Sequence, residues 1–232
     1  MSYIITIRRA DPSDLPQMAS VLIRAFSPGP WSRYLFPPHL RVKPGNADEF
    51  DFRLHMLSSK FGSPGREHVC ATIQYPGEEK EVVVGWAQWI DPEGQMGLDE
   101  EKTWKKAGKE GDSAVNMAGL DREALGRLTR EGELLEKRLE EYLGEDGTKQ
   151  SRLLNLLLID PSHQREGLGR LLAQNGLIPA ARAGKSVRLR STPEGRPLYL
   201  SLGFEDVCQQ EVIGQMQYGM VWRAPVDTKM TA

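Results

Sequence analysis

Apolar residues along the chain follow two periods, one typical of strands and one typical of helices. Short apolar or β-branched segments predict seven strands, at residues 3–9, 69–75, 81–90, 153–159, 187–191, 205–213 and 216–223. Amphipathic spacing predicts helices at residues 12–26, 50–61, 120–143, 167–183 and 196–202. Strands and helices alternate after residue 153, which implies a crossover, a locally parallel sheet and an α/β fold.

The pattern changes between residues 91 and 150. The first part is polar and glycine-rich without a period, and the charged helix expected at about 120–143 carries leucines along one side. We interpret 91–150 as a surface insertion, because it is too short for a core of its own. We therefore expect a single domain over residues 1–224 and a mobile tail at 225–232.

Composition narrows the function classes. The 232 residues are 39% hydrophobic and 27% charged, and the formal net charge of −2 predicts no global field for nucleic acid or an anionic membrane. No apolar run reaches the length of a membrane span. Two cysteines cannot form a disulfide scaffold, and the four histidines lack metal-site spacing. We expect a cytoplasmic protein that binds no metal.

One segment combines a buried strand, a polar turn and a glycine-rich helix start. The apolar run ending at Ile159 is followed by Asp160-Pro161, and Gly167 and Gly169 open the next helix. Such a helix start presents unpaired N–H groups and the positive end of the helix dipole. Glycine lets a ligand approach the backbone closely, so the segment predicts a phosphate site.

Neither of two common nucleotide motifs fits. A dinucleotide fingerprint would need glycine where Leu172 stands, and a P-loop ending at Gly184-Lys185-Ser186 would need glycine where Pro179 stands. Residues 152–196 nevertheless hold eight basic and three acidic residues, a local charge of +5. That field suits a polyphosphate ligand.

Two motifs in this region resemble those of the GNAT acetyltransferase superfamily. Residues 164–169 (QREGLG) match its Q/R-x-x-G-x-G/A motif, with the usual hydrophobic-Asp-Pro lead-in. Residues 199–204 (YLSLGF) match its Tyr-x-x-x-Gly-Phe signature. The order of the remaining elements is similar as well. The resemblance implies a GNAT fold, with a mixed central sheet of about seven strands flanked by helices and a helical insertion before the fourth strand.

The same resemblance implies that acetyl-CoA is the acyl donor and that the reaction uses no metal. Backbone groups of Leu157, Leu158 and Ile159 would pair with the pantetheine arm. The pyrophosphate would bind the loop formed by Gln164, Arg165, Glu166, Gly167, Leu168, Gly169 and Arg170. Tyr199 would protonate the leaving thiolate, because a phenol stays protonated at neutral pH.

Some positions leave the chemistry open. Glu166 places an acid in a phosphate loop, and Pro179 is expected to kink the helix that follows. Asn155 is the one polar residue in its apolar run, and it is either a ligand contact or a satisfied structural amide. Side chains that could act as the base by chemistry alone are Glu67, His68, Asp91, His55 and His39.

Aromatic residues predict an acceptor pocket. Phe26, Trp31, Tyr34 and Phe36 cluster at and after the end of the first helix, where GNAT proteins build their acceptor wall. Trp86 and Trp89 lie on a strand near the chemistry and, at their spacing, face opposite sides of it. We read Trp31, Tyr34, Trp86, Trp89 and Asn155 as candidate acceptor contacts, with ordinary packing as the alternative.

The resulting hypothesis is an N-acetyltransferase that acts on a small-molecule amine by direct attack, as a monomer or homodimer. The alternatives are acetylation of a protein N-terminus or lysine, a non-catalytic acyl-CoA-binding regulatory module, and an interaction protein that recruits a partner through the helix at 120–143. The presence of Tyr199 favours an enzyme over a pure binding module. A longer acyl donor in place of acetyl stays open.

Overall fold

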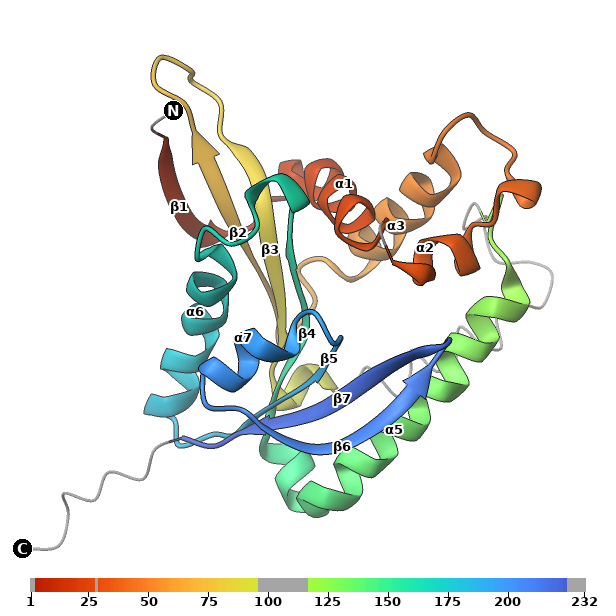
Figure 1. Ribbon diagram of the computed structural model, residues 1–232. Helices are drawn as coiled ribbons and strands as arrows, with labels where there is room; N and C mark the ends of the chain where they lie inside the picture. The colour runs from red at the N-terminus through yellow and green to blue at the C-terminus, as the bar shows by residue number, and fades with distance from the viewer. Residues whose placement is uncertain (1–2, 28, 96–116, 225–232) are drawn as a thin grey trace, which may run out of the picture.

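The computed structural model describes residues 3–27, 29–95 and 117–224, and it is built on one seven-stranded sheet (Figure 1). The strand order is β1-β2-β3-β4-β5-β7-β6, and the β4–β5 pair is parallel while the other pairs are antiparallel. The predicted mixed sheet is confirmed. The strands are β1 Ile4–Arg9, β2 Arg66–Gln74, β3 Val82–Ile90, β4 Arg152–Ile159, β5 Val187–Ser191, β6 Glu205–Val212 and β7 Gln215–Trp222.

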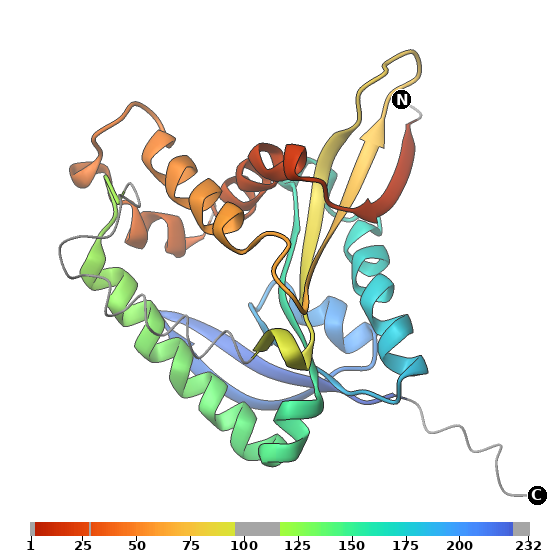
Figure 2. The same ribbon diagram turned by 180° about the vertical axis from the view of Figure 1, so that it is seen from behind.

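Helices cover both faces of the sheet (Figure 2). One core cluster packs Trp86 against Leu15 and Met18 of α1, and the other packs Trp89 against Leu172 and Leu177 of α6. The two tryptophans therefore face opposite sides of β3, as their spacing predicts. The helices are α1 Leu15–Phe26, α2 Pro30–Leu35, α3 Ala47–Lys60, α5 Arg122–Gln150, α6 Leu168–Arg182 and α7 Arg196–Ser201, with 3-10 turns η1 Pro12–Asp14, η2 Pro38–Leu40 and η4 Pro161–His163.

Helix α5 lies before β4, as predicted, but it is longer than the sequence pattern indicates. The regular helix breaks at Gly144 (φ 71°), next to the predicted end at Leu143, and a further helical stretch continues to Gln150. Leu135 and Leu139 are fully buried, and α5 packs against β6 and β7. The helix therefore covers β6 and β7 and contributes two leucines to the buried interior. The remainder of the polar segment, residues 96–116, lies outside the described residues.

The sheet opens between β4 and β5. Strand β4 pairs with β3 as far as Ile159, but it pairs with β5 only over Arg152–Leu154. A bulge in the β3–β4 register leaves Asn155 without a partner residue on β3. Beyond Leu154, β4 thus presents backbone N–H and C=O groups on the side where β5 diverges. An extended ligand with amide groups would satisfy them.

Candidate functional site

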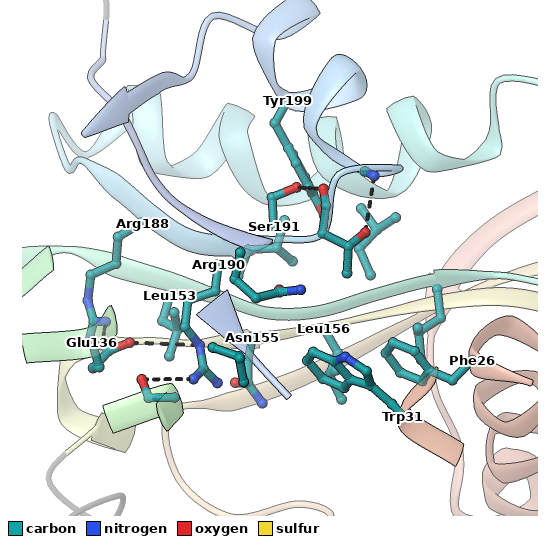
Figure 3. A pocket seen from close by; sticks show the side chains of 18 of the residues that line it. Phe26, Trp31, Glu136, Leu153, Asn155, Leu156, Arg188, Arg190, Ser191 and Tyr199 are labelled. Carbon is teal, nitrogen blue, oxygen red and sulfur yellow. Dashed lines mark hydrogen bonds and ion pairs between the residues drawn. The ribbon is translucent and has the colours of Figure 1, made fainter. Parts of the chain in front are cut away.

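A cavity of about 2040 Å³ occupies the opening between β4 and β5. Its walls come from α1, α2, α3 and α5 on one side of the sheet, from α7 on the other, and from the loop at 163–170. Leu157, Leu158 and Ile159 line it, in the stretch where β4 has left β5. Figure 3 shows Tyr199, Ser191, Arg190 and Asn155 around the same space.

The loop that follows β4 is shaped to hold an anion. Arg165 (φ 69°) and Gly167 (φ 85°) both adopt left-handed backbone conformations, and α6 begins at Leu168. Backbone N–H groups arranged in this way form a concave nest at a helix N-terminus. Asp160 stabilises the turn, because its side chain accepts hydrogen bonds from the Ser162 backbone N–H (3.0 Å) and from Arg24 (2.6 Å).

The predicted loop residues line the cavity with one exception. Gln164, Arg165, Gly167, Leu168, Gly169 and Arg170 do so. Glu166 is turned away, because the Tyr3 hydroxyl donates to its carboxylate at 2.5 Å and His163 Nδ1 lies 3.6 Å from the same oxygen. Its acid therefore does not face a bound phosphate, and only its backbone is suited to one. Pro179 lies inside α6, and the helix continues past it to Arg182.

Tyr199 lies on α7 with its side chain at the cavity wall. Only 7% of the residue is exposed, and its ring packs edge-on against Phe204 at 5.6 Å. Burial raises the pKa of the phenol well above its usual value. The hydroxyl consequently stays protonated at neutral and mildly alkaline pH, as a proton donor must.

Asn155 is hydrogen-bonded to a buried Gln88–His68 pair. Its Nδ2 donates to Gln88 Oε1 at 2.5 Å, and Gln88 Nε2 lies 2.8 Å from His68 Nε2. Since the Gln88 oxygen is used by Asn155, its nitrogen must donate to His68, whose Nε2 must then be unprotonated. Burial, helped by the charge of Arg66, lowers the pKa of His68 to about 4, which keeps the imidazole neutral.

Because His68 is buried in its neutral form, we expect the free energy of unfolding to decrease at acid pH. The unfolded chain binds a proton at His68 near pH 6.5 and the folded chain only near pH 4, so stability is lost as pH falls between these values. We expect His68 alone to lower the free energy of unfolding by about 2 to 3 kcal/mol between pH 7 and 4.5. Urea unfolding of His68→Gln should show a correspondingly shallower pH dependence. His55→Gln, a change at an exposed position of α3, should retain the wild-type slope, and equal slopes for all three proteins would contradict the assignment.

The acceptor candidates divide into two groups. Trp31 and Asn155 line the cavity, and Trp31 stacks on Phe26 with ring centroids 5.6 Å apart. The structure places the other three, Tyr34, Trp86 and Trp89, outside the cavity lining. Tyr34 is 45% exposed and lies outside the cavity lining.

Trp86 and Trp89 are fully buried core residues, which explains why they do not reach the cavity. Trp86 Nε1 donates to the Met18 carbonyl at 3.0 Å. Trp89 fills the space beside Gly176, where an added Cβ would lie 2.2 Å from the indole ring. Arg152 covers the Trp89 ring at 4.8 Å. Both rings therefore act in packing.

The candidate bases also lie away from the cavity lining. Glu67 and Asp91 both bind Arg152, at 2.7 and 3.0 Å, and His68 is held by Gln88. His39 and His55 are exposed. None of these side chains is positioned to take a proton directly from a group in the cavity, so a water relay is required if one of them is the base.

Sequence reasoning missed most of the charged residues that line the cavity, among them a cluster of two arginines and one glutamate. Arg188 and Arg190 project from β5 at alternate positions, and Glu136 of α5 contacts both of them (Figure 3). The signal available in the sequence was an Arg-x-Arg repeat in a short strand, because residues two apart share a face. In the described ranges, no helix is long and apolar enough to cross a bilayer, and no cluster of metal-ligating side chains is found.

Comparisons with known proteins agree with this arrangement. Residues 131–216 match the family model of the acetyltransferase (GNAT) domain. No curated protein matches the chain. Among solved structures, a mosquito arylalkylamine N-acetyltransferase like 5b has a TM-score of 0.59 at 18% identity, covering 95% of this chain and 100% of that one.

Two bacterial structures are similar over almost the whole chain. The first, from Corynebacterium glutamicum, is described as histone acetyltransferase HPA2 and related acetyltransferase (TM-score 0.58, 17% identity, 98% of this chain and 99% of that one). The second, a putative acetyltransferase from Salmonella typhimurium with its cofactor acetyl-CoA, has a TM-score of 0.51 at 18% identity and covers 98% of each chain. Residues 131–216 therefore match a GNAT acetyltransferase domain, and the likeness to the solved structures shows the same fold over almost the whole chain.

Proposed function

We propose that the chain transfers an acetyl group from acetyl-CoA to a small-molecule amine by direct attack. The observation that carries the proposal is the open edge of β4 at residues 155–159, which shares one cavity with the glycine loop and Tyr199. These parts correspond to the three needs of the donor. The strand edge pairs with the pantetheine amides, the nest at Arg165–Arg170 binds the pyrophosphate, and Tyr199 lies where a thiolate would leave.

The reaction needs no covalent enzyme intermediate. The neutral amine nitrogen attacks the thioester carbonyl, a C–N bond forms, and the C–S bond breaks. A backbone N–H at the β4 bulge polarises the carbonyl oxygen, Tyr199 gives its proton to the sulfur, and the amine proton leaves through water. Proton return from solvent to Tyr199 balances the cycle, so the products are the N-acetylated amine and free coenzyme A.

Asn155 is suited to orient the amine. Its amide donor is used by Gln88, which leaves its Oδ1 as an acceptor for an amine N–H. The stacked pair of Phe26 and Trp31, together with Leu35 and Leu128, gives the cavity an apolar wall opposite. These apolar and aromatic side chains favour an acceptor with an organic, apolar body next to its amine. Acetylation of a protein N-terminus or lysine is the second candidate.

The test combines binding and transfer on the same protein. Calorimetry should show acetyl-CoA binding, and free thiol should be released faster when amines from a mixed panel of small molecules and peptides are added. Release driven by small amines supports the proposal, whereas release driven only by peptides favours the second candidate. Binding without acceptor-dependent release across the panel would indicate a regulatory acyl-CoA-binding module. Absence of binding would contradict the donor site.

A further inference from the structure

Two arginines of β5 share a single carboxylate at the cavity wall. Arg188 is 3% exposed and is fully engaged, since it binds Glu136, Ser151 Oγ (3.1 Å) and Gln95 Oε1 (2.8 Å). Glu136 therefore neutralises Arg188. The charge of Arg190, two residues along the same face, is left without an equivalent close partner among the described residues.

The polar contacts of Arg190 in the described part of the chain are weak. Its Nε lies 3.9 Å from Glu136 Oε2, beyond hydrogen-bond distance, and its Nη1 reaches the Gly132 carbonyl oxygen at 3.5 Å. The side chain is 42% exposed, yet it lies inside the cavity. Helix α5 makes room for it, because a Cβ on Gly132 would lie 2.9 Å from Nη1.

The position of Arg190 separates it from the donor phosphates. Its neighbour Leu189 pairs with Leu154, at the closed end of the opening, whereas the phosphate loop follows Ile159 at the open end. Five strand residues separate the two ends, about 16 Å. Arg190 lies instead on the acceptor side, in the cavity that Asn155 and Tyr199 also line (Figure 3).

We propose that Arg190 binds a carboxylate carried by the acceptor. This inference rests on the function proposed above. A guanidinium presents a planar fork of donors that matches a carboxylate, and the long contacts of Arg190 leave this fork available to a ligand. The acceptor is then an amino acid or a related amino-carboxylate. Its amine lies at Asn155, and its apolar side chain packs against Phe26 and Trp31.

Matched acceptors test this assignment. Phenylalanine and phenethylamine differ only in the carboxylate, so the ratio of their kcat/KM values measures its recognition. We expect Arg190→Gln to lower that ratio by about 10- to 100-fold, because charge-assisted hydrogen bonds to the carboxylate are lost. The kcat/KM for phenethylamine should change less than about threefold. The control Arg182→Gln, at an exposed position outside the cavity, should leave the ratio unchanged.

The two proposals fail in different ways. A wild-type protein that acetylates phenethylamine and phenylalanine equally well, or an Arg190→Gln variant that loses both equally, would overturn the carboxylate site and leave the transferase intact. If no amine is acetylated, calorimetry of N-acetylphenylalanine in the presence of coenzyme A decides the site. Binding that weakens by about 10-fold or more in Arg190→Gln supports it, and equal binding to both proteins overturns it.

Discussion

Replacing Gly169 with arginine should weaken acetyl-CoA binding by at least about 100-fold, because several charge-assisted hydrogen bonds to the pyrophosphate are lost together. The space at this position is already narrow. A Cβ there would lie 3.1 Å from Leu198 Cδ2 and 3.7 Å from Leu157 Cδ2, so a long side chain must extend into the cavity. Arginine would then occupy the path by which a phosphate approaches the backbone. Calorimetric titration with acetyl-CoA measures the loss.

Two further variants distinguish blocking of the phosphate site from a general disturbance of the protein by the substitution. Gly169→Ala adds a single methyl group against the flexible end of Leu198, so its affinity should fall less than about 10-fold. Ile178→Arg adds the same charged side chain to α6 at a 51% exposed position outside the cavity, and its affinity should equal that of the wild type. Wild-type affinity in Gly169→Arg would show that the pyrophosphate binds elsewhere.

Secondary structure followed closely from the sequence wherever one period dominated. The seven strands have alternating or continuous apolar patterns, and each is found within a few residues of its predicted limits. The regular part of α5 also ends next to its predicted limit, at Gly144, whose positive φ terminates a helix. The packing position of α5 could not be predicted from the sequence. That Leu135 and Leu139 close over β6 and β7 depends on where the chain returns, which a local pattern does not contain.

The candidate site was predictable only where a motif fixes backbone geometry. The glycine loop needs particular φ values, and Tyr199 follows a recognisable spacing, so both could be named in advance. Aromatic residues carry no such constraint. Trp86 and Trp89 resemble pocket residues in sequence, but both faces of β3 are covered by helices, and the rings are fully buried.

The charged residues at the cavity wall also could not be assigned from the sequence. Arg188 and Arg190 in a short strand suggest a solvated surface, and Glu136 suggests the polar side of a helix. They meet because α5 packs against β6 and β7, which brings the Glu136 side chain to the arginines of β5. Helix α5 thus supplies Glu136 to the cavity, whereas the open edge of β4 and the glycine loop lie on other elements.

Replacing Tyr199 with phenylalanine should lower kcat by about 100-fold or more, the usual contribution of a positioned general acid. Affinity for acetyl-CoA should stay nearly unchanged, because the ring that packs on Phe204 is retained and only the hydroxyl is removed. Since burial holds the pKa of Tyr199 above its usual value, ionisation of this residue should not limit the wild-type rate up to about pH 10. Steady-state thiol release against a saturating amine measures kcat.

Tyr218→Phe provides the matched control for this change. It removes the same hydroxyl from the neighbouring β7, where Tyr218 packs beneath Arg196 at 4.9 Å and lies outside the cavity. Its kcat should equal the wild-type value. If Tyr199→Phe also retained the wild-type kcat, the thiolate would leave with a proton from solvent, and Tyr199 would serve only to shape the cavity wall. A fall in kcat confined to Tyr199→Phe, at unchanged acetyl-CoA affinity, would establish that the hydroxyl acts during transfer rather than during binding.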